Sequence, residues 1–349
     1  MDQISKIDKN FAVETKLDLE NVRFYSALDK PFSLHGVFYQ DGRFRRMPSD
    51  VAASVSPSVL KLHTHTAGGR LRFRTDSAYV AIKAVMPQIS RMSHFALTGS
   101  AGFDLYKGTD EVFVKTFTPP YTMENGFENV IQFSGKEMRD LTINFPLYSG
   151  ISELYIGLED DATVEAPLPY KIEKPIVFYG SSITQGGCAS RPGNSYECRV
   201  SRALSADFIN LGFSGSCRAE EEMAHYLKGL DMSVFVYDYD HNSRNPDYLE
   251  KTHKRLFEIF RKENPHVPVL MLSRPYPILK GNALKSKEII EKTYLDAKAA
   301  GDENVYFLDG PALMKIAGKD GTVDGCHPND FGFYSMAEAV TEVLKQMLI

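Results

Sequence analysis

The spacing of apolar residues changes half-way along the chain, and this change constrains the fold more than any other feature. Between about residues 58 and 165, apolar residues alternate with polar ones, as at residues 70–74. A period of two is typical of an antiparallel strand that buries one side. From Pro175 onward, continuous apolar runs alternate instead with helical patterns. Two kinds of sheet in 349 residues predict two domains.

The first domain is predicted to be an all-β, jelly-roll-like sandwich. Short alternating stretches occur at residues 70–74, 80–84, 112–114, 141–145 and 154–158, and turn sequences rich in Gly, Asp and Asn separate them. Many short strands with regularly spaced turns are typical of sandwiches. A proline-bearing segment, residues 166–175, follows. Because proline stiffens the chain and removes hydrogen-bond donors, we place the boundary here, between domains 1–170 and 171–349.

The second domain is predicted to be α/β, with a parallel sheet covered on both faces. Apolar runs of strand length lie at residues 175–179, 208–211, 234–237, 267–272 and 305–308. Such runs are typical of strands that are buried on both faces. Helical stripes lie between and after them: Leu249, His253, Leu256 and Phe260, and then Phe333, Met336, Val340, Val343 and Met347. Strands that alternate with helices build parallel sheets.

Composition excludes several classes of protein. Lys and Arg number 40 and Asp and Glu 45, so the formal net charge of −5 argues against nucleic-acid partners. No apolar stretch is long enough to span a bilayer, and the first residues lack the apolar segment of a secretory signal. We therefore expect no membrane partner and a cytoplasmic location. Four cysteines without a C-x-x-C pattern predict neither a disulfide scaffold nor a structural metal.

Chemically useful residues follow the predicted parallel strands. In open α/β sheets, ligands bind beyond the carboxyl ends of the strands. Two serines, Ser181 and Ser182, follow the first run, and an Asp-x-x-His, Asp324 to His327, follows the last. A serine hydroxyl becomes a nucleophile when a histidine takes its proton and a carboxylate orients that histidine. The pattern therefore predicts acyl transfer at this edge of the sheet.

These residues resemble the conserved blocks of the SGNH hydrolases, the GDSL-type esterases. Residues 180–184, Gly-Ser-Ser-Ile-Thr, resemble the first block, and the other matches are Gly215, Asn242, Asp324 and His327. Residues 102–106, Gly-Phe-Asp-Leu-Tyr, are similar to the G-x-D-L-Y signature of a β-domain that precedes this hydrolase in a two-domain subfamily. The resemblance implies a three-layer α/β/α domain that needs no metal or organic cofactor. It also implies a catalytic triad of Ser182, Asp324 and His327 and an oxyanion hole from Ser182, Gly215 and Asn242.

Some assignments have alternatives. Ser181 stands where the family has aspartate, but Ile183 and Thr184 put Ser182 in register as the nucleophile. Asp238 and His241 repeat the Asp-x-x-His spacing; Asp324 and His327 are preferred because an amphipathic helix follows them. His241 and Arg274 are candidates for substrate contacts, and Arg274 is equally a candidate for a structural ion pair. Cys326 is either a thiol nucleophile or, preferably, a buried thiol, and Cys217 has no assigned role. His63 and His65 are either metal ligands or, preferably, packed side chains.

The sequence thus predicts a serine esterase that removes small acyl groups, most simply acetyl. The carbohydrate part of the expected substrate comes only from the resemblance, since jelly-roll SGNH proteins include carbohydrate acetyl-esterases. An acyltransferase or thioesterase with the same triad is an alternative. So is a non-catalytic carbohydrate-binding protein, although such a protein would not need Ser182, Asp324 and His327 together. The partner is then a small-molecule or oligosaccharide ester, and the oligomeric state stays open.

Overall fold

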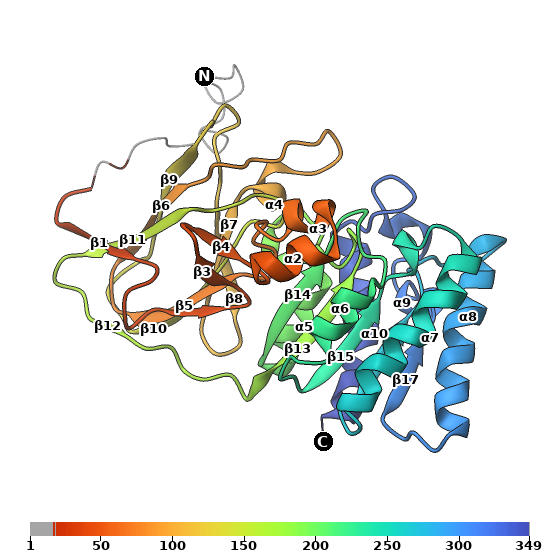
Figure 1. Ribbon diagram of the computed structural model, residues 1–349. Coiled ribbons are helices and arrows are strands. Elements are labelled where there is room, and N and C mark those ends of the chain that lie inside the picture. Colours follow the sequence, from red (N-terminus) through yellow and green to blue (C-terminus); the bar gives the residue numbers. More distant parts are fainter. Residues whose placement is uncertain (1–16, 18, 349) are drawn as a thin grey trace.

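Two antiparallel sheets face each other in the first half of the chain (Figure 1), in a computed structural model that describes residues 17 and 19–348. One sheet has the order β1 (Val22–Ser26), β11 (Glu153–Glu159), β6 (Tyr79–Val85), β9 (Gly126–Gln132). The other runs β12 (Val164–Glu165), β5 (Arg70–Thr75), β10 (Arg139–Asn144), β7 (Phe103–Lys107), β8 (Val112–Phe117), with β2 (Ser33–His35) also paired to β5. The side chains between the sheets are apolar and fully buried, among them Leu71, Phe73, Ile82 and Ile143. The predicted sandwich is confirmed.

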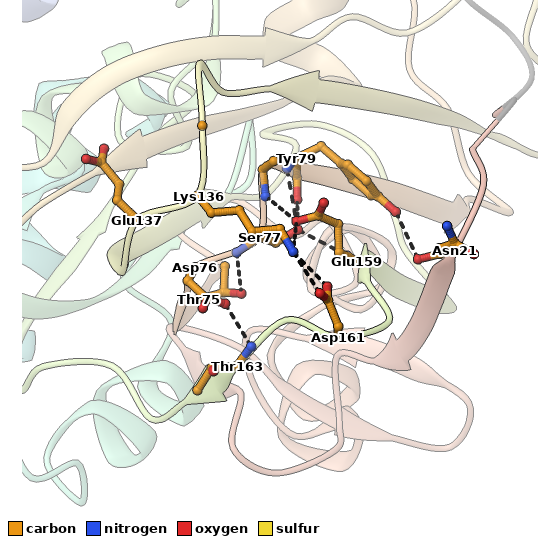
Figure 2. A network of polar contacts seen from close by, with 12 residues as sticks. Asn21, Thr75, Asp76, Ser77, Tyr79, Lys136, Glu137, Glu159, Asp161 and Thr163 are labelled. Carbon is orange, nitrogen blue, oxygen red and sulfur yellow. Dashed lines mark hydrogen bonds and ion pairs between the residues drawn. The ribbon is translucent and has the colours of Figure 1, made fainter.

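A polar network closes one end of this sandwich, where the chain crosses between the sheets (Figure 2). The Ser77 hydroxyl donates to the Tyr79 carbonyl (2.7 Å) and accepts from the Glu159 backbone N–H (3.1 Å). The Glu159 carboxylate accepts in turn from the Ala78 N–H (2.8 Å). The Lys136 ammonium lies 3.4 Å from Glu159 and 2.8 Å from Asp161. These contacts connect the β5–β6 turn to the β11–β12 turn, so the two sheets are joined by polar contacts as well as by their core.

Five parallel strands form the sheet of the second half, as predicted. Their order is β14 (Ala206–Gly212), β13 (Ile172–Gly180), β15 (Val234–Asp238), β16 (Val269–Leu272), β17 (Val305–Leu308). In the register of the sheet, Gly180 pairs with Gly212 on one side and with Asp238 on the other. Three strands therefore end side by side, and the loops that follow them start at one edge.

Helices cover both faces of this sheet (Figure 1). Along β13, Phe178 packs with α5 (Tyr196–Leu204) and α10 (Asp330–Met347), whereas its neighbour Tyr179 packs with residues of α6 (Glu221–Leu227), α7 (Pro246–Glu263) and α8 (Asn282–Ala299). This alternation gives the three layers that the resemblance implied. No helix among residues 17 and 19–348 is long and apolar enough to cross a membrane. The remaining elements are β3 (Phe38–Gln40), β4 (Arg43–Arg45), α4 (Leu97–Ser100), α9 (Gly310–Leu313), and the 3₁₀ turns η2 (Pro192–Asn194), η3 (Asp240–Asn242) and η4 (Gly318–Gly321).

Two helices of the first half belong to the second core. The sequence pattern predicts neither α2 (Ser49–Val55) nor α3 (Pro57–Leu62). Their apolar residues Ala52, Val55 and Val59 are buried in the same cluster as Tyr179. A segment that precedes most strands of the sandwich thus completes one face of the parallel sheet.

The interpretation of β5 as a half-buried strand is wrong, because its arginine side is covered as well. Arg70 and Arg72 are 1% and 4% exposed. Arg70 forms an ion pair with Asp207 and donates to the Phe208 carbonyl (3.0 Å). Arg72 pairs with Asp140 (3.2 Å) and lies over the Tyr170 ring. The second domain and the linker cover this strand, so the alternation of polar and apolar residues marks a polar interface rather than a solvent face.

The G-x-D-L-Y segment is a second interdomain contact. The Asp104 carboxylate, fully buried, accepts from the Gly193 backbone N–H (2.8 Å) and pairs with Arg191 (3.0 Å). The Tyr106 hydroxyl also accepts from Arg191, and its ring lies where a Cβ on Gly193 would be. The aspartate and tyrosine of this motif therefore fix the loop that enters α5, close to the edge of the sheet at which β13 ends.

Candidate active site

The serine loop, residues 181–188, begins where β13 ends. Gly180 is required there, since a Cβ would overlap Thr184 and the Asp238 backbone. Ser181 is fully buried, and its hydroxyl accepts from the Ile183 N–H (3.1 Å). Ser182 is partly exposed, and its Oγ lies 3.0 Å from Nε2 of His327. Of the two adjacent serines, the structure brings Ser182 to the histidine.

Asp324 holds His327 in one orientation. Its Oδ2 lies 2.8 Å from Nδ1 of the ring, and its Oδ1 accepts from the backbone N–H groups of Cys326 (2.9 Å) and His327 (2.7 Å). Gly325, with φ of +85°, allows this tight loop. Partial burial acts in the opposite direction, but the hydrogen bonds from His327 and Cys326 lower the pKa of Asp324 to about 2. The ionised carboxylate keeps the proton on Nδ1, which leaves Nε2 as an acceptor for the Ser182 hydroxyl.

Three hydrogen-bond donors follow the three adjacent strand ends. They are the backbone N–H groups of Ser182 and Gly215 and the side-chain amide of Asn242. The Asn242 Oδ1 accepts from the Cys217 N–H (3.2 Å), so its Nδ2 donors point elsewhere. Gly215 has φ of +66°, and a Cβ built on it would have no other atom within 4 Å. Among residues 17 and 19–348, none of these three donors has an acceptor. Unpaired donors beside a serine suit an oxyanion.

A relay of side chains from the first domain reaches the turn before Gly215. The Gln185 Oε1 accepts from the Ser214 N–H (3.0 Å), so Gln185 Nε2 faces Nδ1 of His65 (3.1 Å). On the other side of the ring, Nε2 of His65 lies 2.8 Å from the amide nitrogen Nε2 of Gln88. Burial, and then the charges of Arg46 and Lys61, lower the pKa of His65 to about 3. The ring is therefore neutral, and Nδ1 accepts from the Gln185 amide, whereas the Gln88 amide nitrogen faces Nε2.

Two more residues of the first domain support the same loops. The Tyr148 hydroxyl donates to the Ser182 carbonyl (3.2 Å). Arg46, 2% exposed, donates to the carbonyls of Gly212 (2.6 Å) and Asn210 (3.1 Å) at the end of β14. The sequence does not predict a role for Tyr148, Arg46 or the relay, and it predicts His65 only as a packed or metal-binding residue. His63 and His65 do not face a common site, because His63 ends α3 and is hydrogen-bonded to Arg45 (2.9 Å).

The second Asp-x-x-His, Asp238 to His241, lies outside the hydrogen-bonded chain of Ser182, His327 and Asp324. Asp238 is buried and accepts from the Thr184 hydroxyl (3.0 Å), and burial raises its pKa to about 7. His241 packs edge-on against Tyr276, and burial lowers its pKa to about 3. Its Nδ1 lies 3.9 Å from the Cys326 sulfur, whereas its Nε2 has no partner among the described residues.

Arg274 and two cysteines can also be placed. Arg274 is bound to Asp240 through its guanidinium (3.1 Å to Oδ2, 2.9 Å to the carbonyl) and its backbone N–H (3.1 Å), so it takes part in an ion pair. Burial raises the pKa of both cysteine thiols, Cys217 and Cys326. Cys326 is therefore protonated near neutrality, which disfavours it as a nucleophile. Cys217 acts through its backbone, which orients Asn242.

The comparisons with protein families agree with this geometry. Residues 173–345 match the model of the GDSL-like Lipase/Acylhydrolase family, and residues 22–164 match the GxDLY model, the N-terminus of Esterase_SGNH_hydro-type. The chain belongs to the GDSL-like lipase/acylhydrolase family. Together the two models account for most of both halves of the chain. No curated protein matches the chain at a significant level.

Solved structures share the two-domain fold of the acylhydrolase. A protein described as a GDSL-like lipase from Bacteroides ovatus is 28% identical, with a TM-score of 0.83 over 94% of this chain and 98% of its own. The salicylyl-acyltransferase SsfX3 is 20% identical, with a TM-score of 0.77 over the same shares. A family two carbohydrate esterase from Cellvibrio japonicus is 12% identical, with a TM-score of 0.63, again over 94% and 98%. The last two similarities concern the fold alone.

Proposed function

We propose that this acylhydrolase is a serine esterase in which Ser182, His327 and Asp324 are the catalytic residues. The observation that carries the proposal is the continuous chain of hydrogen bonds from Ser182 Oγ to His327 Nε2 and from Nδ1 to Asp324. Ser182 Oγ attacks the ester carbonyl carbon, and His327 Nε2 takes the hydroxyl proton. That proton then goes to the leaving alcohol as the C–O bond breaks. Water then attacks the acyl-enzyme while His327 Nε2 takes a proton from it, and that proton goes to Ser182 Oγ as the acyl–serine bond breaks and the acid leaves.

The tetrahedral intermediates carry a negative oxygen that needs hydrogen-bond donors. We assign this role to the backbone N–H groups of Ser182 and Gly215 and to the Asn242 amide, which lack acceptors among the described residues. Each such donor contributes a factor of about 10²–10³ to the rate in well-studied enzymes. A non-catalytic binding protein has no use for a triad together with unpaired donors.

We infer that the substrate is a small acyl ester, acetyl above all, on a carbohydrate. The site is open, since the side chains of Asp324 and His327 are 33% and 25% exposed. An open site suits a bulky alcohol, whereas a long acyl chain needs an enclosed apolar channel. Support also comes from fold neighbours, which include an acetyl xylan esterase from Butyrivibrio proteoclasticus and a Clostridium thermocellum esterase bound to cellohexaose. His241 and Arg274 stay the proposed substrate contacts, although Nε2 of His241 is buried and the Arg274 guanidinium is bound to Asp240, so both side chains would have to move to meet a substrate.

Acyl transfer to an alcohol is the second candidate, favoured by the similarity of both domains to the acyltransferase SsfX3. The two activities share the acyl-enzyme and differ in what attacks it. Water gives hydrolysis, and an acceptor hydroxyl gives transfer. The open site admits both water and an acceptor alcohol, so the acceptor that reaches the acyl-enzyme decides between hydrolysis and transfer.

Acetate release from acetylated xylo-oligosaccharides and from p-nitrophenyl acetate tests the proposal. Wild type should release acetate from both esters, Ser182→Ala should release none, and Ser181→Ala, the matched control, should stay active. Reactions with and without free oligosaccharide acceptor separate transfer from hydrolysis. Binding of oligosaccharide by wild type without any acetate release would instead indicate a binding protein.

A further inference from the structure

A group of three side chains lies beside Ser182, and the esterase mechanism does not need all three of them. They are His94, Cys188 and His327, called here the His–Cys–His cluster, and one ligand atom of each lies within 4.8 Å of the other two. The rings of His94 and His327 are 5.9 Å apart between centroids. Imidazole nitrogen and thiolate sulfur are the donors that Zn²⁺ prefers.

The three residues come from three separate segments. His94 is exposed on the loop between β6 and α4 of the first domain, and the bond from the Ser100 hydroxyl to the Ser90 carbonyl (2.9 Å) helps to hold that loop. Cys188 ends the serine loop and is 7% exposed, with φ of +76°. Backbone in this region is strained for any residue except glycine, so Cys188 is held there by its surroundings. The cluster therefore exists only because the two domains are packed together.

The second shell of a zinc site is already present. Metal-bound histidines usually donate their other ring N–H to a carboxylate, which fixes the ring and raises its basicity. His327 makes that bond, from Nδ1 to Asp324 (2.8 Å). Nδ1 is thus occupied, and the nitrogen left for a metal is Nε2, which faces the Ser182 hydroxyl (3.0 Å).

The distances allow a tetrahedral site with a small movement. Bonds of about 2.0–2.3 Å to Zn²⁺ place neighbouring ligand atoms about 3.5 Å apart. The cluster would have to close from at most 4.8 Å, and the exposed His94 ring is free to rotate. Two histidines and one thiolate fill three positions, which leaves the fourth to water.

We propose that the His–Cys–His cluster binds Zn²⁺ and that the bound ion reversibly inhibits the esterase. The inhibition rests on the proposed role of His327, because the Nε2 lone pair that binds Zn²⁺ can no longer take the Ser182 proton. On binding, the Cys188 thiol loses its proton to solvent and its sulfur bonds to the metal, so that no oxidant or reductant is needed. Burial raises the pKa of the Cys188 thiol to about 12, so the thiol is protonated until a metal displaces the proton. Soft donors favour Zn²⁺ and Cd²⁺ over Mg²⁺ and Ca²⁺.

Inhibition and metal binding can be measured separately. Hydrolysis of p-nitrophenyl acetate is followed in zinc-buffered solutions, with Mg²⁺ and Ca²⁺ as hard-ion controls. His94→Ala and Cys188→Ala should keep most of the basal activity and raise the zinc concentration for half-inhibition by about tenfold or more, since even second-shell losses cost 10–100-fold. His225→Ala removes another exposed histidine, one beside Glu221 on α6, and should inhibit like wild type.

Cobalt gives a readout that does not depend on activity. Co²⁺ bound to wild type should give a sulfur-to-metal charge-transfer band, absent in Cys188→Ala and weakened in His94→Ala. The inactive Ser182→Ala should keep the band, because it retains all three ligands. The proposal is overturned if wild type gives no such band, if zinc inhibits both variants like wild type, or if zinc activates. An inactive wild type that still gives the band would refute the esterase proposal and leave the metal site standing.

Discussion

The relay through His65 predicts that the first domain sets the geometry of the oxyanion turn. In His65→Leu, one Gln185 N–H and the Gln88 amide lose their partner at a site where His65 is 4% exposed. Each buried polar group left without a partner costs about 1–3 kcal/mol, so the free energy of unfolding should fall by about 2–6 kcal/mol. His65→Gln restores one donor and one acceptor and should recover most of that loss.

The activity of His65→Leu should fall, and the loss should appear in kcat. Gln185 also holds the Ser214 N–H, one residue before Gly215, so a loosened Gln185 moves an oxyanion donor without removing it. Loss of a whole donor costs about 10²–10³ in rate, and a displaced donor should cost about tenfold. KM should change little, because the donor acts on the negative oxygen of the transition state rather than on the bound ester.

The assays are urea unfolding and steady-state kinetics on p-nitrophenyl acetate for wild type, His65→Leu and His65→Gln. The reasoning is refuted if His65→Leu keeps the wild-type kcat, or if His65→Gln is damaged as much as His65→Leu. Because the pKa of His65 is lowered to about 3, the relay should not titrate between about pH 5 and 9. The activity ratio of His65→Leu to wild type should therefore be constant over that interval.

Three further predictions concern other residues. Asn242→Ala should lower kcat by about 10²–10³ with little change in KM, and an unchanged kcat would exclude Asn242 from the oxyanion hole. Gly193→Ala puts a Cβ into the Tyr106 ring and should destabilise the interdomain contact by about 1–3 kcal/mol in urea unfolding, so wild-type stability would contradict the packing described. Burial lowers the pKa of His253 to about 3. Below about pH 6.5 the unfolded chain therefore binds a proton at His253 that the native state does not bind, and the free energy of unfolding falls as the pH drops from 6.5. His253→Phe removes this effect, so the stability lost between pH 8 and pH 5 should be about 2 kcal/mol smaller than in wild type; an equal loss in both proteins would show that His253 is not buried in its neutral form.

The sequence predicted the parts of the fold that local periodicity encodes. All five apolar runs are strands of the parallel sheet, because a strand that is buried on both faces must be apolar throughout. The stripe of Leu249, His253, Leu256 and Phe260 is buried on α7 as expected. Periodicity could not show that Arg70 and Arg72 face another domain, since an arginine at a polar interface leaves the same pattern as an arginine in water.

The residues of the candidate site also fall into those that the sequence could predict and those that it could not. Ser182 could be predicted because it lies in the loop after a recognisable strand, at the edge of the sheet where ligands bind. Asp324 and His327 could be predicted from their Asp-x-x-His spacing before an amphipathic helix and from the resemblance. His65, Tyr148 and His94 could not be, because each comes from the first domain and reaches the site only through the packing of the two domains. The bond from Gln185 to His65 joins residues 120 positions apart, and no local pattern indicates it.

The central claim is that Ser182 is the nucleophile, and chemical trapping tests it most directly. A fluorophosphonate reagent labels an activated serine covalently, and fragmentation of the labelled peptide by mass spectrometry places the adduct on one residue. We expect one adduct, on Ser182, that is lost in Ser182→Ala and strongly reduced in His327→Ala. An adduct on Ser181, or labelling that persists in Ser182→Ala, would contradict the account.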